Sequence, residues 1–261
     1  MPVENEIARA IKTAEITNYL NKDYQYLKNV NIVEWDIHSA GLSVLKFRKL
    51  LPEDELKELE GMEKHARTVR EGWLQKEKPE VAKEIISTLS KVRQAFVIAN
   101  HIYDREILTI KKDAIFLINK TPTMTIIKDV FEFRKKGTYS SYMLLNDNKE
   151  FYYNSFLDSL EIKGLTEEAK KKQSEFILKD IKKIIKSGEK LQPDMMYVLL
   201  KNYRDKYLNR KLPVETYREL DSGKFRIGNY MLEDVSEDLL SDIDISQNYM
   251  NYILPMINIL I

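Results

Sequence analysis

The chain contains no cysteine, which excludes disulfide bridges and thiolate metal sites and fits a reducing compartment. It has only three histidines, so a bound metal ion would be held mainly by oxygen ligands. No apolar run reaches the roughly 18 residues that a membrane span needs. The N-terminal residues MPVENEIARA lack the basic-then-apolar pattern of a signal peptide. We therefore expect a cytoplasmic protein with no membrane partner.

An excess of charge of one sign is also lacking, because 42 basic and 41 acidic residues leave a net charge of +1. The net charge of the whole chain therefore does not indicate a nucleic-acid partner. The distribution is uneven: residues 164–211 carry thirteen Lys or Arg against seven Asp or Glu, whereas residues 212–261 carry three against nine. Such a basic run is most simply a solvated helical face, and the alternative is a grip on a nucleic-acid backbone.

Hydrophobic periodicity predicts an α+β fold. Helical and strand patterns alternate early, strands dominate the middle of the chain, and helical patterns return after Ser155. In chain order we expect a helix over 4–28, a strand over 30–37, a helix over 42–51, a two-helix hairpin over 53–102 with its second helix opening at Pro79, a β-hairpin over 105–119, strands up to 153 with a turn at Lys136–Gly137, and a short hairpin over 221–230.

Two aspartates stand at the ends of apolar strands, Asp36 in VNIVEWDIHSAGLSVL and Asp113 in REILTIKKDAIFLIN. A strand-borne carboxylate among apolar neighbours is disfavoured, and it is costly to desolvate unless it is paired or binds a metal. Taken singly, each is most simply a turn or capping residue. Together they can meet in one sheet, where two carboxylates would hold two Mg²⁺ or Mn²⁺ ions for phosphoryl transfer. We therefore expect Asp36 and Asp113 on adjacent strands.

Short motifs around these aspartates resemble the family B DNA polymerases. The segment DIHSAGLS, from Asp36 to Ser43, is similar to motif A of that family, and KKDAIF is similar to motif C with Asp113 at the second, metal-binding aspartate. Lys111 replaces the first aspartate of motif C. The helical stretch 53–102 lies where the family has two antiparallel fingers helices, and KKGTY, from Lys135 to Tyr139, resembles its primer-template contact.

The resemblance implies a palm-like antiparallel sheet over 1–52 and 103–155, a fingers-like two-helix insertion over 53–102, and a helical thumb-like region over 156–261. It implies catalytic roles for Asp36 and Asp113, with the Ile37 carbonyl as a further metal ligand. The residues implied for nucleotide binding are Ser39, Gly41, Lys91, Arg93, Asn100 and Tyr103. Those implied for nucleic-acid binding are Lys135, Lys136, Tyr139, Lys182, Lys183 and Lys186.

The family places an aromatic residue that excludes a 2′-hydroxyl at the position of Gly41. Glycine offers no such wall, so the resemblance implies weak discrimination between ribo- and deoxyribonucleotides. A purely conformational role for glycine, in the turn between strand and helix, is the alternative. The family's triphosphate-binding Lys is also replaced here, by Phe96.

Two functions from different classes remain open at this point. The first is template-directed nucleotidyl transfer by a two-metal mechanism, as in a small polymerase or primase with primer-template and nucleoside triphosphates as partners. The second is a catalytically degenerate palm-like accessory or assembly subunit that binds nucleic acid or protein. A two-metal nuclease would need more carboxylates than this pair. Metal-dependent nucleotide incorporation distinguishes the first from the second.

Overall fold

The computed structural model describes residues 2–145 and 149–163, together with scattered positions between 182 and 231. The chain forms two compact units, which we describe separately. The first unit comprises Met1–Asn21 and Val30–Tyr139, and the second comprises Lys22–Asn29 and Ser140–Ile261. Both contain antiparallel sheet, and the α+β class expected from the sequence is confirmed.

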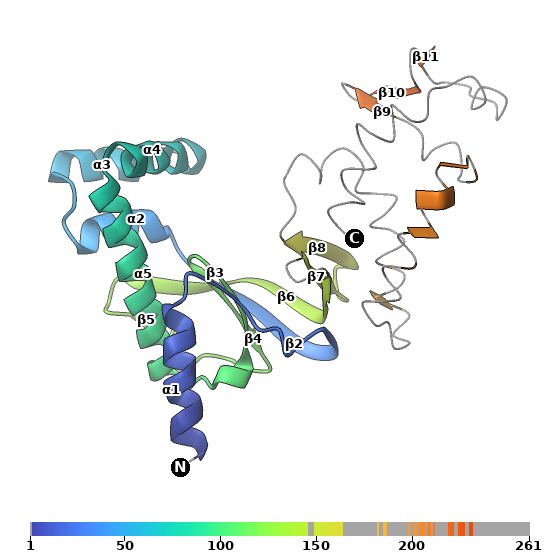
Figure 1. Cartoon of the computed structure of the whole chain (residues 1–261). Helices are drawn as coiled ribbons and strands as arrows, with labels where there is room; N and C mark the ends of the chain where they lie inside the picture. The colour runs from blue at the N-terminus through green and yellow to red at the C-terminus, as the bar shows by residue number, and fades with distance from the viewer. Residues whose placement is uncertain are drawn as a thin grey trace. The chain divides into compact units, whose positions relative to one another are not determined.

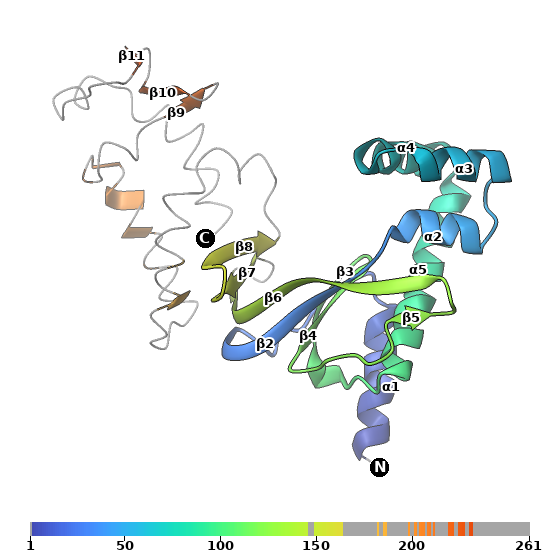
Figure 2. The same cartoon turned by 180° about the vertical axis from the view of Figure 1, so that it is seen from behind.

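The first unit is a sheet with helices packed on it (Figures 1 and 2). Its helices are α1 (Pro2–Glu15), α2 (Ala40–Phe47), α3 (Glu53–Gly61), α4 (Lys64–Glu77), α5 (Pro79–Ala99) and the 3-10 turn η1 (Asp104–Glu106). Its strands are β1 (Asn18–Leu20), β2 (Tyr26–Ile37), β3 (Ile107–Lys111), β4 (Ala114–Ile118), β5 (Ile126–Ile127) and β6 (Phe131–Leu145). The strand order is β1-β3-β4-β2-β6, with β5 also paired to β6.

The second unit contains the first residues of β2 and the last residues of β6. Here β6 pairs with β7 (Lys149–Asn154), and β7 pairs with β8 (Ser159–Lys163), both antiparallel. A separate three-stranded sheet is formed by β9 (Glu219–Asp221), β10 (Lys224–Ile227) and β11 (Tyr230–Met231). This sheet confirms the hairpin expected over 221–230.

The β-hairpin expected over 105–119 is confirmed, with β3 and β4 joined by a turn at Lys112–Asp113. Lys112 has a φ of 54°, a left-handed conformation that is uncommon for residues other than glycine. The other edge of β4 pairs with β2 in a register that sets Asp36 opposite Ala114. The sheet therefore brings the two aspartate-bearing segments together.

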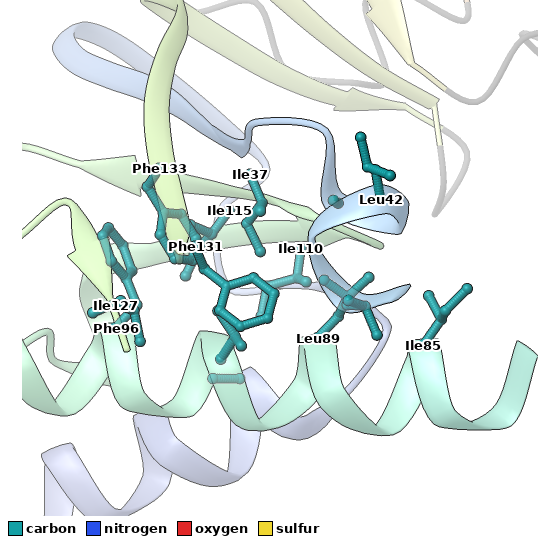
Figure 3. Close-up of a cluster of buried hydrophobic side chains, with 14 of the residues drawn as sticks. Ile37, Leu42, Ile85, Leu89, Phe96, Ile110, Ile115, Ile127, Phe131 and Phe133 are labelled. Carbon is teal, nitrogen blue, oxygen red and sulfur yellow. The ribbon is translucent and has the colours of Figure 1, made fainter. Parts of the chain in front are cut away.

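The hydrophobic core of the first unit lies between the sheet and helices α1 and α5, as Figure 3 shows for part of it. Phe96 of α5 is fully buried and stacks on Phe133 of β6, with ring centroids 3.9 Å apart. Ile37 points into this core from β2. Because side chains alternate along a strand, Asp36 lies on the opposite face of the sheet, away from α1 and α5.

The helical part of the first unit differs from expectation in three places. Helix α1 ends at Glu15 rather than 28, because residues 18–20 pair with β3 as the strand β1. Helix α2 ends at Phe47 rather than 51. The insertion over 53–102 contains three helices instead of two, because Met62 between α3 and α4 is extended, with a ψ of 144°.

Two predictions about strands are also wrong. The turn expected at Lys136–Gly137 is absent from the described residues, because β6 runs continuously through that position. The turn lies earlier, at Lys128 and Asp129, which both have positive φ angles. Helical structure was expected directly after Ser155, but residues 159–163 form β8 and pair with β7.

Most of the helical region expected over 156–261 lies outside the described residues. Among the residues that are described, no helix combines the length and the apolar character needed to cross a bilayer.

Candidate active site

Asp36 at the end of β2 and Asp113 in the β3–β4 turn lie against each other. The Ile37 amide donates to the Asp113 carbonyl at 3.4 Å, and the two carboxyl groups are within hydrogen-bonding reach. Burial, and then the negative charge of Asp36, raise the pKa of Asp113 to about 6. The juxtaposition predicted from the sequence is therefore present in the fold.

Lys136 of β6 supplies a positive charge to this face of the sheet. Its Nζ lies 3.1 Å from Asp36 Oδ2 and 3.4 Å from Glu34 Oε1. Burial lowers the pKa of Lys136, but the two carboxylates outweigh burial and raise it overall. Glu34 is almost fully buried and also accepts a hydrogen bond from the Tyr139 hydroxyl at 3.0 Å. One lysine thus bridges two acidic residues of β2.

The carboxylate pair opens into a cleft of about 450 Å³, which is within the size range of small-molecule sites. The cleft is bounded by the end of β2, the start of α2, one face of α4 and the middle of β6. Its lining residues are Asp36, Ile37, His38, Ser39, Ala40, Gly41, Lys64, Arg67, Thr68, Glu71, Asp113, Arg134, Lys135 and Lys136. Three acidic side chains, those of Asp36, Asp113 and Glu71, therefore share the cleft with five Lys or Arg side chains.

Helix α4 contributes Lys64, Arg67 and Thr68 to the cleft, at the i, i+3 and i+4 spacing of one helix face. The Arg67 guanidinium donates to the Ser39 hydroxyl at 3.2 Å, which ties α4 to the turn after β2. Sequence reasoning missed this wall, because it assigned the basic nucleotide contacts to α5. The available signal was the polar face of residues 64–71 within a helical pattern.

Gly41 lies in the first turn of α2 with no left-handed φ, so a turn conformation does not require glycine here. A Cβ at this position would collide with the Glu71 carboxylate. Burial raises the pKa of Glu71, with an opposing effect from Arg67, whose Nε is 4.0 Å from Glu71 Oε1. The residue with the left-handed φ, 49°, is Ser39. Glycine therefore provides space for Glu71.

Arg93, expected to bind a nucleotide, is buried beneath the site and does not line the cleft. Its guanidinium donates to the backbone carbonyls of Ala14 at 3.0 Å and Ile16 at 3.3 Å, and also to that of Lys112. Burial lowers the pKa of Arg93 to about 10, and the charge of Asp113 opposes this shift. Arg93 therefore anchors the β3–β4 turn that carries Asp113.

Three other residues expected to bind a nucleotide do not line the cleft either. Lys91 is exposed on α5. The Asn100 side chain is buried and bonds to the backbone at Phe96 and over 123–124. The Tyr103 ring is contacted by basic side chains, Arg105 at 4.9 Å and Lys120 at 5.6 Å from the ring centroid.

The residues expected to contact nucleic acid have different locations. Lys135 and Lys136 line the cleft, whereas Tyr139 is buried between Glu34 and Phe116. In the second unit, Lys182 and Lys186 form ion pairs with Asp158, at 2.8 Å and 2.9 Å. Lys183 lies outside the described residues.

The donor set fits a hard divalent cation. Two ionised carboxylates are both hydrogen-bond acceptors, so a proton or a cation must lie between them. In addition, Asp36 Oδ1 is buried without a hydrogen-bond partner, so one carboxylate oxygen can accept a further ligand. Among the described residues, no group of three His, Cys, Asp or Glu side chains converges on one point. Mg²⁺ is usually held by one or two carboxylates together with substrate phosphates, so a metal ion here would take its remaining ligands from the substrate and water.

The raised pKa of Asp113 predicts a pH-dependent stability. Its pKa is about 6 when folded and 3.8 when exposed, so the folded state binds the proton more tightly. The stabilisation that this proton gives is complete below pH 4 and is lost as pH rises through 6, by up to about 3 kcal/mol. Urea denaturation between pH 4 and 7 should show this loss in the wild type relative to Asp113→Asn. Equal pH dependence in both proteins would contradict it.

Residues 10–261 match the family model described as Bacteriophage PBS1 gene 130 protein, which covers nearly the whole chain. No curated protein matches the chain.

Proposed function

We propose that this chain, which belongs to the Bacteriophage PBS1 gene 130 protein family, catalyses template-directed nucleotidyl transfer. The reaction would take place in the cleft between β2, α4 and β6. The single observation that supports this most is the pairing of Asp36 and Asp113 at the bottom of a basic cleft. The partners are nucleoside triphosphates and a primer-template, as in a small polymerase or primase. The cofactor is Mg²⁺ or Mn²⁺, with two ions in the complete site.

Each part of the cleft has a task in this proposal. Asp36 and Asp113, with the Ile37 carbonyl, would hold the ions, which would lower the pKa of the attacking hydroxyl and neutralise charge on the phosphates. The basic side chains of α4 orient the triphosphate by charge-assisted hydrogen bonds. Lys135 and Arg134, both exposed on β6, are available to phosphates of the primer-template.

The α4 wall gives a testable consequence. Replacing Lys64 with Ala should raise the KM for a nucleoside triphosphate about tenfold, because one charge-assisted contact to phosphate is worth roughly 1.5–3 kcal/mol. The matched control is Arg70→Ala, on the same helix but outside the cleft lining. Steady-state kinetics of nucleotide incorporation measures both. An unchanged KM in Lys64→Ala, or equal effects in the two variants, would contradict this assignment.

Gly41 and Glu71 give a second consequence, which concerns the sugar. The Glu71 carboxylate occupies the space beside Gly41, and it can accept a hydrogen bond from a 2′-hydroxyl. We therefore expect efficient use of ribonucleotides, and a shift of at least about tenfold toward deoxyribonucleotides in Glu71→Leu. The measurement is the ratio of incorporation efficiencies for matched ribo- and deoxyribonucleotides. A strong deoxyribonucleotide preference in the wild type would exclude this role.

A second candidate function is a catalytically degenerate palm-like accessory subunit. The observation that favours it is the ion pair of Lys136 with Asp36, at 3.1 Å, because an ammonium group there offsets the carboxylate charge without a metal ion. Under this alternative the cleft binds nucleic acid or a protein and transfers no nucleotide. Replacing Lys136 with Met separates the two functions, because Lys136 competes with metal ions for the Asp36 carboxylate. In an active enzyme this variant should keep or increase metal-dependent nucleotide incorporation. In an accessory subunit neither the wild type nor the variant incorporates nucleotide.

A further inference from the structure

The β7–β8 hairpin of the second unit ends in two large apolar side chains that are open to solvent. Phe156 is 93% exposed and Leu157 is 67% exposed, and Phe156 is the most exposed of the large hydrophobic residues described. Both belong to the four-residue loop between Asn154 and Ser159, which are paired in the ladder. We call residues 155–158 the hairpin tip.

The hairpin tip is held in a defined conformation by its own polar groups. Asn154 Oδ1 accepts hydrogen bonds from the backbone amides of Phe156 and Leu157, both at 2.9 Å. Asp158 closes the loop with a left-handed φ of 49°, and its carboxylate accepts from the Tyr153 hydroxyl at 2.8 Å. These bonds order the backbone of the tip, and a loop that is already ordered loses less conformational entropy when it contacts a partner.

Two described lysines lie at the hairpin tip. The ammonium groups of Lys182 and Lys186 both pair with Asp158, which leaves one positive charge in excess at this cluster. These lysines belong to the segment 164–211, in which thirteen basic residues stand against seven acidic ones. An exposed aromatic ring beside basic groups matches the two requirements of single-stranded nucleic acid, a surface for base stacking and countercharge for phosphates.

We propose that the hairpin tip binds single-stranded nucleic acid, with the Phe156 ring stacked on an unpaired base and the Lys182–Lys186 cluster near its phosphates. An apolar protein groove would accept Phe156 and Leu157 but has no need of the two lysines, whereas an anionic lipid surface would use both features and is separated by the vesicle measurement below. This proposal extends the proposed function, because the hairpin tip would be a second binding site for the same nucleic acid. It does not require catalysis.

The test is the affinity of the full chain for a labelled oligo(dT), measured by fluorescence anisotropy in EDTA without nucleoside triphosphate. Phe156→Ala should weaken binding about tenfold, as loss of one base–aromatic stack does. Phe156→Trp should retain the affinity, and Trp73→Ala, an exposed aromatic residue in the first unit, should have no effect. An oligomer of equal length with abasic sites should bind the wild type and Phe156→Ala equally.

The proposal is overturned if Phe156→Ala binds oligo(dT) as the wild type does, or if it loses the same affinity for the abasic oligomer. Loss of binding to anionic phospholipid vesicles with unchanged oligo(dT) affinity would overturn it in favour of a lipid surface. Asp113→Asn separates this inference from the proposed function. This variant should lose nucleotide incorporation and keep its affinity for oligo(dT). A wild-type protein that binds oligo(dT) through Phe156 but incorporates no nucleotide would refute the proposed function and leave this inference intact.

Discussion

Replacing Asp36 or Asp113 with Asn is expected to lower nucleotide incorporation by about 10³-fold or more, which corresponds to roughly 4 kcal/mol of transition-state stabilisation. Each variant removes one of the two carboxylates that meet at the bottom of the cleft. Mn²⁺ binding, followed by electron paramagnetic resonance, should weaken in parallel. Asparagine keeps the shape of the side chain, and in Asp113→Asn it relieves the buried charge, so this variant should remain folded.

The matched control for these variants is Asp129→Asn. Asp129 is an exposed residue in the turn before β6, outside the cleft lining, and its left-handed conformation suits asparagine. It should incorporate nucleotide and bind Mn²⁺ as the wild type does. If Asp36→Asn retains wild-type incorporation, or if Asp129→Asn loses as much, the assignment of the carboxylate pair as the metal site is wrong.

Replacing Arg93 with Leu is expected to lower the free energy of unfolding by about 3–5 kcal/mol. The guanidinium is 1% exposed and serves the carbonyls of Ala14, Ile16 and Lys112, so its removal leaves buried acceptors without donors. Arg93→Lys should recover only part of this loss, because an ammonium group cannot place its donors at all three carbonyls as the planar guanidinium does. Urea denaturation followed by circular dichroism measures the effect.

Lys91 provides the comparison, because it lies two residues away on the same helix but is exposed. Lys91→Ala should change the free energy of unfolding by less than about 0.5 kcal/mol. Arg93→Lys should also reduce Mn²⁺ affinity, since Lys112 and Asp113 form the turn that Arg93 holds. A stable Arg93→Leu protein with weakened nucleotide binding would contradict the anchoring role and support the role in nucleotide binding.

The sequence was sufficient to predict the meeting of the two aspartates, because each lies at the end of an apolar strand where an unpaired carboxylate is costly. The same reasoning applies to Glu34, which stands two residues before Asp36 and was not singled out. It is buried and shares Lys136 with Asp36. A charged residue inside a strand pattern is therefore informative even when it belongs to no recognised motif.

The basic wall and the buried arginine could not be assigned from sequence alone. Helical periodicity groups Lys64, Arg67 and Thr68 on one face, but it does not say which of two neighbouring helices turns its polar face toward the aspartates. Arg93 has the residue type of a phosphate ligand, yet it lies at an apolar position of α5 between the buried Val92 and Phe96. Its three carbonyl partners come from segments 19–79 residues away.

The most direct test of the central claim is primer extension by the wild-type chain, with labelled primer-template, all four nucleoside triphosphates in ribo and deoxy forms, and Mg²⁺ or Mn²⁺. The account predicts products longer than the primer, dependent on the cation and on the template base, and absent with Asp113→Asn. Absence of extension with either cation, in a protein that still binds the primer-template, would contradict catalysis and leave the accessory role of the cleft.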